Sequence, residues 1–261
     1  MKRHVPVLLP LVMGILLSAT ASWGGPPFFT DDPVPVGLHN WEFYLASQHF
    51  LTAGALSGTL PHVEANYGAM PNVQLHLILP MAYTKPNGMP FQYGPGDIEL
   101  GVKFRFLGET RTRPQVGVFP HLELPAGSPG RGLGAGHVQA FLPVWLQKSW
   151  GAWTTYGGGG YWINPGQGNR NYWMFGWEAQ RDLSKSLTVG AELIGHSPSA
   201  VGASGETGIN LGALVAVGKG QVLMASAGRD LHGPNRFFAY VAYYWTWGPA
   251  AGERQGTESA E

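Results

Sequence analysis

The sequence predicts an all-β protein: a single antiparallel, up-and-down β-barrel that crosses a membrane with about twelve strands. Three observations predict this fold. Charged residues make up only 12% of the chain, where about 25% is typical, while aromatic residues make up 12% and glycine occurs 39 times. Segments of about ten residues alternate between apolar and polar side chains. Short turns and longer loops join these segments in alternation.

The clearest period-two alternation lies between residues 97 and 107. One face carries polar residues and a glycine: Asp97, Glu99, Gly101, Lys103 and Arg105. The other face is apolar: Ile98, Leu100, Val102, Phe104 and Phe106. Residues 73–82, 115–124 and 138–147 alternate in the same way. An apolar face opposite a charged face over this length is typical of a transmembrane strand.

The pattern predicts strands along the whole chain, at 41–50, 59–69, 73–83, 96–107, 114–124, 137–148, 152–163, 171–181, 186–196, 207–217, 221–229 and 236–247. Mostly tight turns follow the even-numbered strands, and mostly longer loops rich in Gly, Pro and Asn follow the odd-numbered ones. This asymmetry is typical of outer-membrane barrels, with short periplasmic turns and long extracellular loops. The alternative is a soluble, secreted β-sandwich or barrel. Uniform strand length, and charges opposite a long apolar stripe, favour the membrane barrel.

The N-terminus indicates export. Residues 1–4 are basic, residues 5–17 are apolar, and Ala19 and Ala21 form the small-residue pattern of a signal-peptidase site. The apolar run is shorter than the about 20 residues that span a bilayer as a helix, so a membrane anchor is the less favoured alternative. The expected organisation is a signal peptide (1–21), a periplasmic N-terminal segment (22–38), an outer-membrane β-barrel (39–247) and a disordered polar tail (248–261).

Composition also excludes several classes of site. The formal net charge is zero, so nothing indicates a nucleic-acid partner. The chain has no cysteine, which excludes disulfides, thiolate metal sites and a cysteine nucleophile. The expected partners are outer-membrane lipids, a small-molecule solute and the outer-membrane assembly machinery, and no cofactor is expected.

Several motifs resemble those of one known family. They are Gly25-Pro26-Pro27-Phe28, Thr30-Asp31-Asp32-Pro33, Trp41-Glu42, residues 68–76, residues 93–97, residues 132–137, residues 153–162 and Gln180-Arg181-Asp182-Leu183. Over nearly all of the mature chain the sequence resembles the "MetA-pathway of phenol degradation" (meta-cleavage pathway) family of outer-membrane transporters. Val34 departs from the acidic residue that many members carry there. The resemblance implies an outer-membrane channel or transporter for small solutes, with aromatic or hydrophobic compounds among the candidates.

Polar residues on the inward face are the candidate pore-lining residues: His62, Glu64, Asp97, Glu99, Lys103, Arg105, His121, Glu123, His137 and Gln139. We expect an acidic, imidazole-rich vestibule toward the outer half, above a basic region of Lys103 and Arg105. Such an arrangement would filter solutes by charge and hydrogen bonding. The alternative is that these groups pair with one another and fill the barrel.

The remaining motifs predict no further chemistry. His62-x-Glu64 and His121-x-Glu123 each offer two ligand types, but no third ligand is visible, so no metal site is expected. No catalytic sequence motif is present, so the protein is not expected to be an enzyme. A barrel-wall enzyme is the least favoured alternative. Asp31-Asp32-Pro33 favours a turn over a cation site or a plug of the barrel mouth.

Gly157 to Gly160 lie within a predicted strand, where glycines allow a bend or a close approach of another segment. Two function classes therefore stay open. One is a channel or transporter for small solutes, and the other is a non-conducting barrel with a structural or adhesive role.

Overall fold

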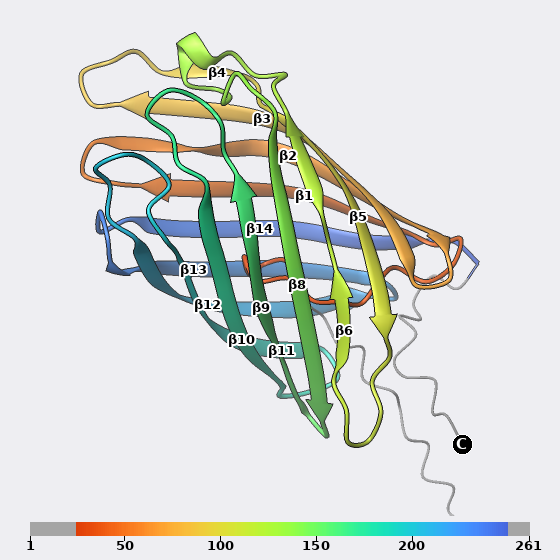
Figure 1. Ribbon diagram of the computed structural model, residues 1–261. Coiled ribbons are helices and arrows are strands. Elements are labelled where there is room, and N and C mark those ends of the chain that lie inside the picture. Colours follow the sequence, from red (N-terminus) through yellow and green to blue (C-terminus); the bar gives the residue numbers. More distant parts are fainter. Residues whose placement is uncertain (1–24, 250–261) are drawn as a thin grey trace, which may run out of the picture.

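The computed structural model describes residues 25–249, which form a closed antiparallel β-barrel (Figure 1). Its strands are β1 (Trp41–Leu51), β2 (Ala55–Met70), β3 (Val73–Pro86), β4 (Gln92–Pro95), β5 (Ile98–Leu107), β6 (Gln115–Val118), β7 (His121–Leu124), β8 (Gln139–Trp150), β9 (Trp153–Ile163), β10 (Tyr172–Asp182), β11 (Leu187–His196), β12 (Glu206–Gly218), β13 (Gln221–His232) and β14 (Phe237–Trp247). A single 3-10 turn, η1 (Pro129–Arg131), lies in a loop. The predicted signal peptide (1–21) and residues 250–261 of the predicted tail lie outside the described residues.

The wall has twelve strand positions, because β4 with β5 and β6 with β7 are each one wall strand with a break. The barrel closes through β1 and β14, which pair antiparallel from Trp41 opposite Trp247 to Leu51 opposite Phe237. The predicted up-and-down barrel of about twelve strands is therefore confirmed. Both ends of the wall meet at the end of the barrel that carries the short turns.

The strand ends differ from the prediction in two ways. β2 begins at Ala55 and β3 ends at Pro86, so this hairpin extends beyond the predicted strands. Backbone ladder hydrogen bonds need no side-chain alternation, which is why the extension carries no sequence pattern. The two breaks lie at residues 96–97 and 119–120. Pro120 has no N–H to donate to the ladder, although its carbonyl still accepts the Val102 N–H at 3.0 Å.

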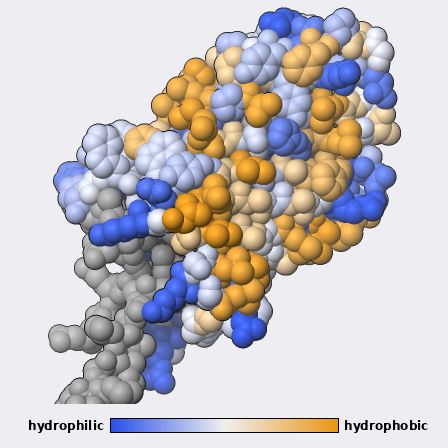
Figure 2. Space-filling model, turned by 180° about the vertical axis from the view of Figure 1, so that it is seen from behind, coloured by the Kyte–Doolittle hydropathy of each residue, from blue (hydrophilic) through white to orange (hydrophobic). Residues whose placement is uncertain are grey.

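The alternating pattern separates an apolar outer face from a polar inner face. Phe104 and Leu142 face outward with 43% and 53% of their surface exposed, whereas Lys103 is buried inside. Apolar residues gather over the middle of the wall and hydrophilic ones toward its ends (Figure 2). Among residues 25–249, no helix is long and apolar enough to cross a bilayer.

The glycine run of β9 marks a close approach of the neighbouring strands. A Cβ atom on Gly159 would lie 2.4 Å from the carbonyl oxygen of Met174 in β10. A Cβ atom on Gly160 would lie 2.5 Å from the Cα atom of Pro143 in β8. Side chains at these positions would push the strands apart, which agrees with the close-approach interpretation.

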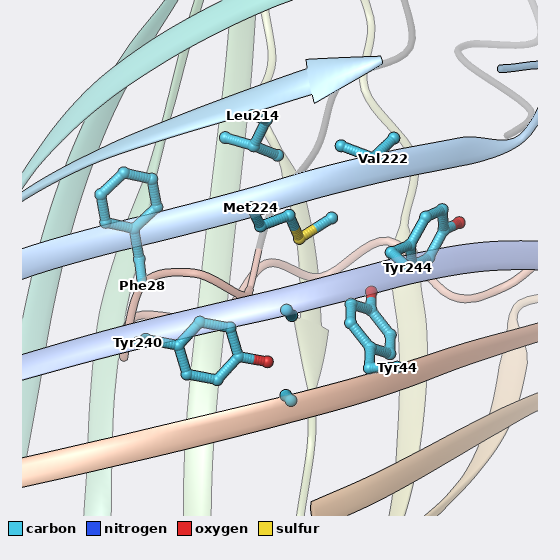
Figure 3. Close-up of a cluster of buried hydrophobic side chains, with 9 residues drawn as sticks. Phe28, Tyr44, Leu214, Val222, Met224, Tyr240 and Tyr244 are labelled. Atoms are coloured by element: carbon cyan, nitrogen blue, oxygen red, sulfur yellow. The ribbon is translucent and has the colours of Figure 1, made fainter. Parts of the chain in front are cut away.

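Two clusters of buried side chains fill part of the barrel interior. One buried cluster includes Phe28, Leu214, Met224 and Tyr244, which come from the N-terminal segment and from β12 to β14 (Figure 3). A second cluster, Phe119, Phe141, Trp145 and Trp162, lies on the β6 to β9 side. These two clusters leave space between them toward the end of the barrel that carries the long loops.

Candidate functional site

The N-terminal segment before β1 lies inside the barrel, which gives the interior its shape. Two inward-facing glycines make room for it. A Cβ atom on Gly176 would lie 2.0 Å from the Thr30 hydroxyl oxygen, and one on Gly212 would lie 2.7 Å from the Phe28 ring. The segment predicted to be periplasmic (22–38) therefore occupies the interior over residues 25–36. The physical reason is that these small wall residues leave a groove that the segment fills.

Inward-facing polar side chains hold the segment in place. The carboxylate of Glu192 accepts the backbone N–H of Phe29 at 3.2 Å and also that of Thr30. The Lys103 ammonium donates to the Asp31 carboxylate at 2.8 Å. Charge-assisted hydrogen bonds of this kind are stronger than neutral ones, so they fix the position of the segment.

The sequence predicts a turn at Asp31-Asp32-Pro33, and the structure has a bend at Pro33. The Asp32 carboxylate accepts the N–H of Val34, two residues on, as expected for a turn that an aspartate initiates. The contact of Asp31 with Lys103 also supports a plug of the barrel mouth, which the sequence favoured less than a turn. Within residues 25–249 no group of three or more His, Cys, Asp or Glu residues could hold a metal ion.

A chamber of about 460 Å³ lies on the long-loop side of the N-terminal segment. Its floor includes Phe29 and Asp31, and its walls include His62, Glu99 and Trp162. A smaller cavity of about 200 Å³ shares the lining residues Phe29, Phe50, Tyr172 and Met174 with it, and extends to His196, Glu206 and Arg236. The two cavities therefore adjoin each other.

Imidazoles and carboxylates form a network on one wall of the chamber. The Nε2 atom of His76 lies 2.9 Å from a Glu99 carboxylate oxygen, and the Nδ1 atom of His121 lies 3.9 Å from the same oxygen. The Nδ1 atom of His76 lies 2.7 Å from the Asn66 amide oxygen, and the Asn66 amide donates to Glu64 at 2.8 Å. These groups position one another, and both carboxylates line the chamber.

Aromatic rings form the adjoining wall, on β8, β9 and β10. The Phe141 and Trp162 rings are stacked with centroids 4.9 Å apart, and the Trp162 and Tyr172 rings are stacked at 5.9 Å. The His121 ring lies 5.4 Å from Trp162 and links this stack to the imidazole wall. A ligand in the chamber would therefore meet a polar wall and an adjoining aromatic wall.

The ten candidate pore-lining residues divide into three groups. The first group lines the chamber and consists of His62, Glu64, Glu99 and His121. His62 is held there by Thr59, whose hydroxyl lies 2.7 Å from its Nδ1 atom. These four residues bring two imidazoles and two carboxylates to the lining of the chamber.

The second group lies near the long loops. Asp97 accepts the backbone N–H groups of Gly127 and Ala135 at 2.9 and 2.6 Å, so it holds a loop in place. Gln139 donates to the Asn164 amide oxygen at 2.6 Å. The Nε2 atom of His137 lies 3.4 Å from the Asn169 amide nitrogen. Glu123 lies directly opposite Glu99 in the β5–β7 pairing.

The third group is the predicted basic region, and its two members separate. Lys103 pairs with the N-terminal segment. The Arg105 guanidinium instead donates to the side-chain oxygen of Asn72, in the short turn between β2 and β3, at 2.7 Å, and to Gln115 at 3.1 Å. Lys103 and Arg105 therefore pair with other groups, as in the alternative in which polar groups fill the barrel. A chamber nevertheless remains.

Sequence reasoning missed His76 as a site residue, although it lies at the centre of the network. Its position on the polar face of residues 73–82 was visible in the alternation. Its pairing with Glu99 depends on the register between β3 and β5, in which His76 lies opposite Gly101. The alternation pattern could not show that Asp31 and Phe29 line the chamber, because both residues precede the first strand.

Comparison with solved structures shows that the fold is similar to that of outer-membrane barrels. The crystal structure of the COG4313 outer membrane channel from Pseudomonas putida F1 matches with a TM-score of 0.70 at 16% identity, over 83% of this chain and 98% of that one. The chain has the fold of outer-membrane barrels. The NanC porin matches with a TM-score of 0.56 at 7% identity, over 78% of this chain and 98% of that one.

The fold alone does not determine the function. The translocator domain of the autotransporter NalP from Neisseria meningitidis matches with a TM-score of 0.50 at 12% identity, over 79% of this chain and 87% of that one. A porin and an autotransporter domain thus share this architecture with the chain. No protein-family model matches the sequence, and no curated protein sequence matches it.

Proposed function

We propose that this protein is an outer-membrane channel that lets small solutes through the membrane, with aromatic compounds among them. The observation that carries the proposal is the chamber of about 460 Å³ inside a closed barrel with an apolar outer face. Its volume is in the range of pockets that hold small molecules. We also propose membership of the MetA-pathway family, which the sequence motifs and the fold likeness to an outer-membrane channel support.

Interior charge gives the proposed channel a preference for cations. Glu99 and Glu123 lie opposite each other on β5 and β7. Carboxylates in a pore attract cations and repel anions over roughly the Debye length, about 8–10 Å at moderate salt. We expect purified protein in planar bilayers to conduct and to prefer cations in reversal-potential measurements.

The double substitution Glu99→Gln and Glu123→Gln tests this assignment. It should lower the cation preference while the barrel still folds, as judged by heat-modifiable migration in gels. Unchanged selectivity would mean that these carboxylates do not set it.

One observation favours the second function class, a structural or adhesive barrel. The N-terminal segment occupies the interior between the chamber and the short-turn end, with Thr30 and Asp32 fully buried. A correctly folded protein that stays silent in bilayers at all voltages would support this class and contradict the channel.

A further inference from the structure

The lining of the chamber carries three carboxylates and three histidines. Asp31, Glu64 and Glu99 line it, and none of its described lining residues is a lysine or an arginine. The nearby Lys103 pairs with Asp31 at 2.8 Å and leaves Glu64 and Glu99 with histidines and amides as neighbours. The Glu99 side chain remains 21% exposed within the barrel, so its carboxylate is accessible from the chamber. A ligand with a positive charge would complement this wall.

The aromatic wall favours a ligand with an aromatic body. Offset stacking on the Phe141, Trp162 and Tyr172 rings would accommodate a planar ring. Rings in this interior already accept cations: the Lys103 ammonium lies 5.0 Å from the Phe119 centroid, and the Arg236 guanidinium lies 5.5 Å from that of Phe50. Cation–π attraction of this kind is strongest where water is excluded.

Two buried polar groups in the lining lack a hydrogen-bond partner among the described residues. They are the hydroxyl of Tyr240, which is only 7% exposed, and the indole N–H of Trp145, which is 2% exposed. Buried polar groups are normally paired, so these two indicate a site that a ligand or water completes. The Tyr240 oxygen can accept an N–H from an ammonium group, and the Trp145 N–H can donate to an oxygen atom of the ligand or of water.

We infer that the chamber binds a small organic cation, an ammonium group joined to an aromatic ring through a short alkyl chain, with the ammonium at Glu99 and the ring against Phe141, Trp162 and Tyr172. This inference deepens the proposed function by naming the class of solute, and it rests on the chamber being part of the solute path. Neutral aromatic compounds would gain no charge attraction from the carboxylates, and aromatic anions would be repelled by them. The site therefore discriminates by charge among molecules of the same shape.

Isothermal titration calorimetry on the folded, full mature protein in a nonionic maltoside detergent tests the inference. The probes are benzylammonium, benzyl alcohol and benzoate, which share a ring and differ in charge. Benzylammonium should bind at least about tenfold more tightly than the other two, after subtraction of titrations into detergent alone. Equal or tighter binding of benzyl alcohol or benzoate, or no binding of any probe, overturns the inference.

Matched variants locate the binding site. Glu99→Gln should weaken benzylammonium binding by about tenfold. Glu123→Gln removes the same charge from the facing position of β7, outside the chamber lining, and should weaken it much less. Tyr240→Phe removes the unpartnered hydroxyl and should also weaken binding, which provides a second test if Glu99→Gln does not fold. Equal losses from Glu99→Gln and Glu123→Gln would contradict a site at Glu99.

The binding measurement is independent of conduction. A protein that binds benzylammonium selectively but is silent in bilayers would keep this inference and lose the proposed channel. A protein that conducts but shows no preference for the ammonium probe would keep the channel and lose the inference.

Discussion

Leu142 and Gln139 show how single residues in one strand are assigned to opposite sides of the wall. Both belong to β8, three residues apart, so the period-two alternation of a strand directs them to different faces. Leu142 is 53% exposed on the outer face, whereas Gln139 hydrogen-bonds to Asn164 inside. The same substitution at the two positions therefore meets two different environments.

We predict that Leu142→Arg impairs assembly far more than Gln139→Arg. A charged residue on the lipid face near the bilayer midplane costs about 2–4 kcal/mol, whereas the interior offers polar partners. Heat-modifiable migration in gels measures the folded fraction of each variant. Equal folded fractions for the two variants would show that the assigned register is wrong.

At the scale of elements, the N-terminal segment determines the shape of the interior. The Glu192 carboxylate and the Lys103 ammonium bind it. Glycines in the wall leave the space that it occupies. At Gly176, a Cβ atom would meet the Thr30 hydroxyl at 2.0 Å. A change at Gly176 acts on the segment without altering the outer face.

We predict that Gly176→Val displaces residues 29–31 from the interior while the barrel remains closed. Hydrogen exchange across residues 25–36 should rise toward the rate of an exposed loop, because the segment loses its buried hydrogen bonds. Gly54→Val is the matched control, since a Cβ atom on Gly54 meets nothing within 4 Å. Unchanged exchange in Gly176→Val, with normal gel migration, would mean that the segment tolerates the added side chain.

At the scale of the whole molecule, the barrel is held together by a ladder of strand pairs that closes on itself. β1 closes on β14, so every wall strand has two neighbours. In lipid, an unpaired backbone N–H or C=O group costs several kcal/mol, and closure removes all such edges. This explains why the ladder continues past the two breaks in the wall and the glycine run of β9.

We predict that the exported protein begins near Ser22, after cleavage at Ala21. The apolar run followed by Ala19-Thr20-Ala21 is the pattern that signal peptidase recognises. N-terminal sequencing of protein from outer-membrane fractions measures this directly. Protein that still carries residues 1–21 would contradict the prediction.

The sequence by itself determined the barrel, its about twelve strands and the direction of most wall side chains. Alternation encodes these features locally, because a strand that separates lipid from a polar interior must place every second residue outside. Glu99, His121 and Leu142 were therefore assigned to the correct face. The long hairpin of β2 and β3 was only partly predicted, because backbone pairing continues where side chains show no pattern.

Only the tertiary structure decided how the interior is filled. His76 contacts Glu99 because β3 and β5 pair in one particular register. The sequence of either strand alone does not determine the register between two strands that a loop joins. Lys103 meets Asp31 because a segment without periodicity folds back into the barrel. Such contacts join residues 23 and 72 positions apart, respectively, and depend on shape and charge in three dimensions. The chamber exists only where these long-range contacts leave space.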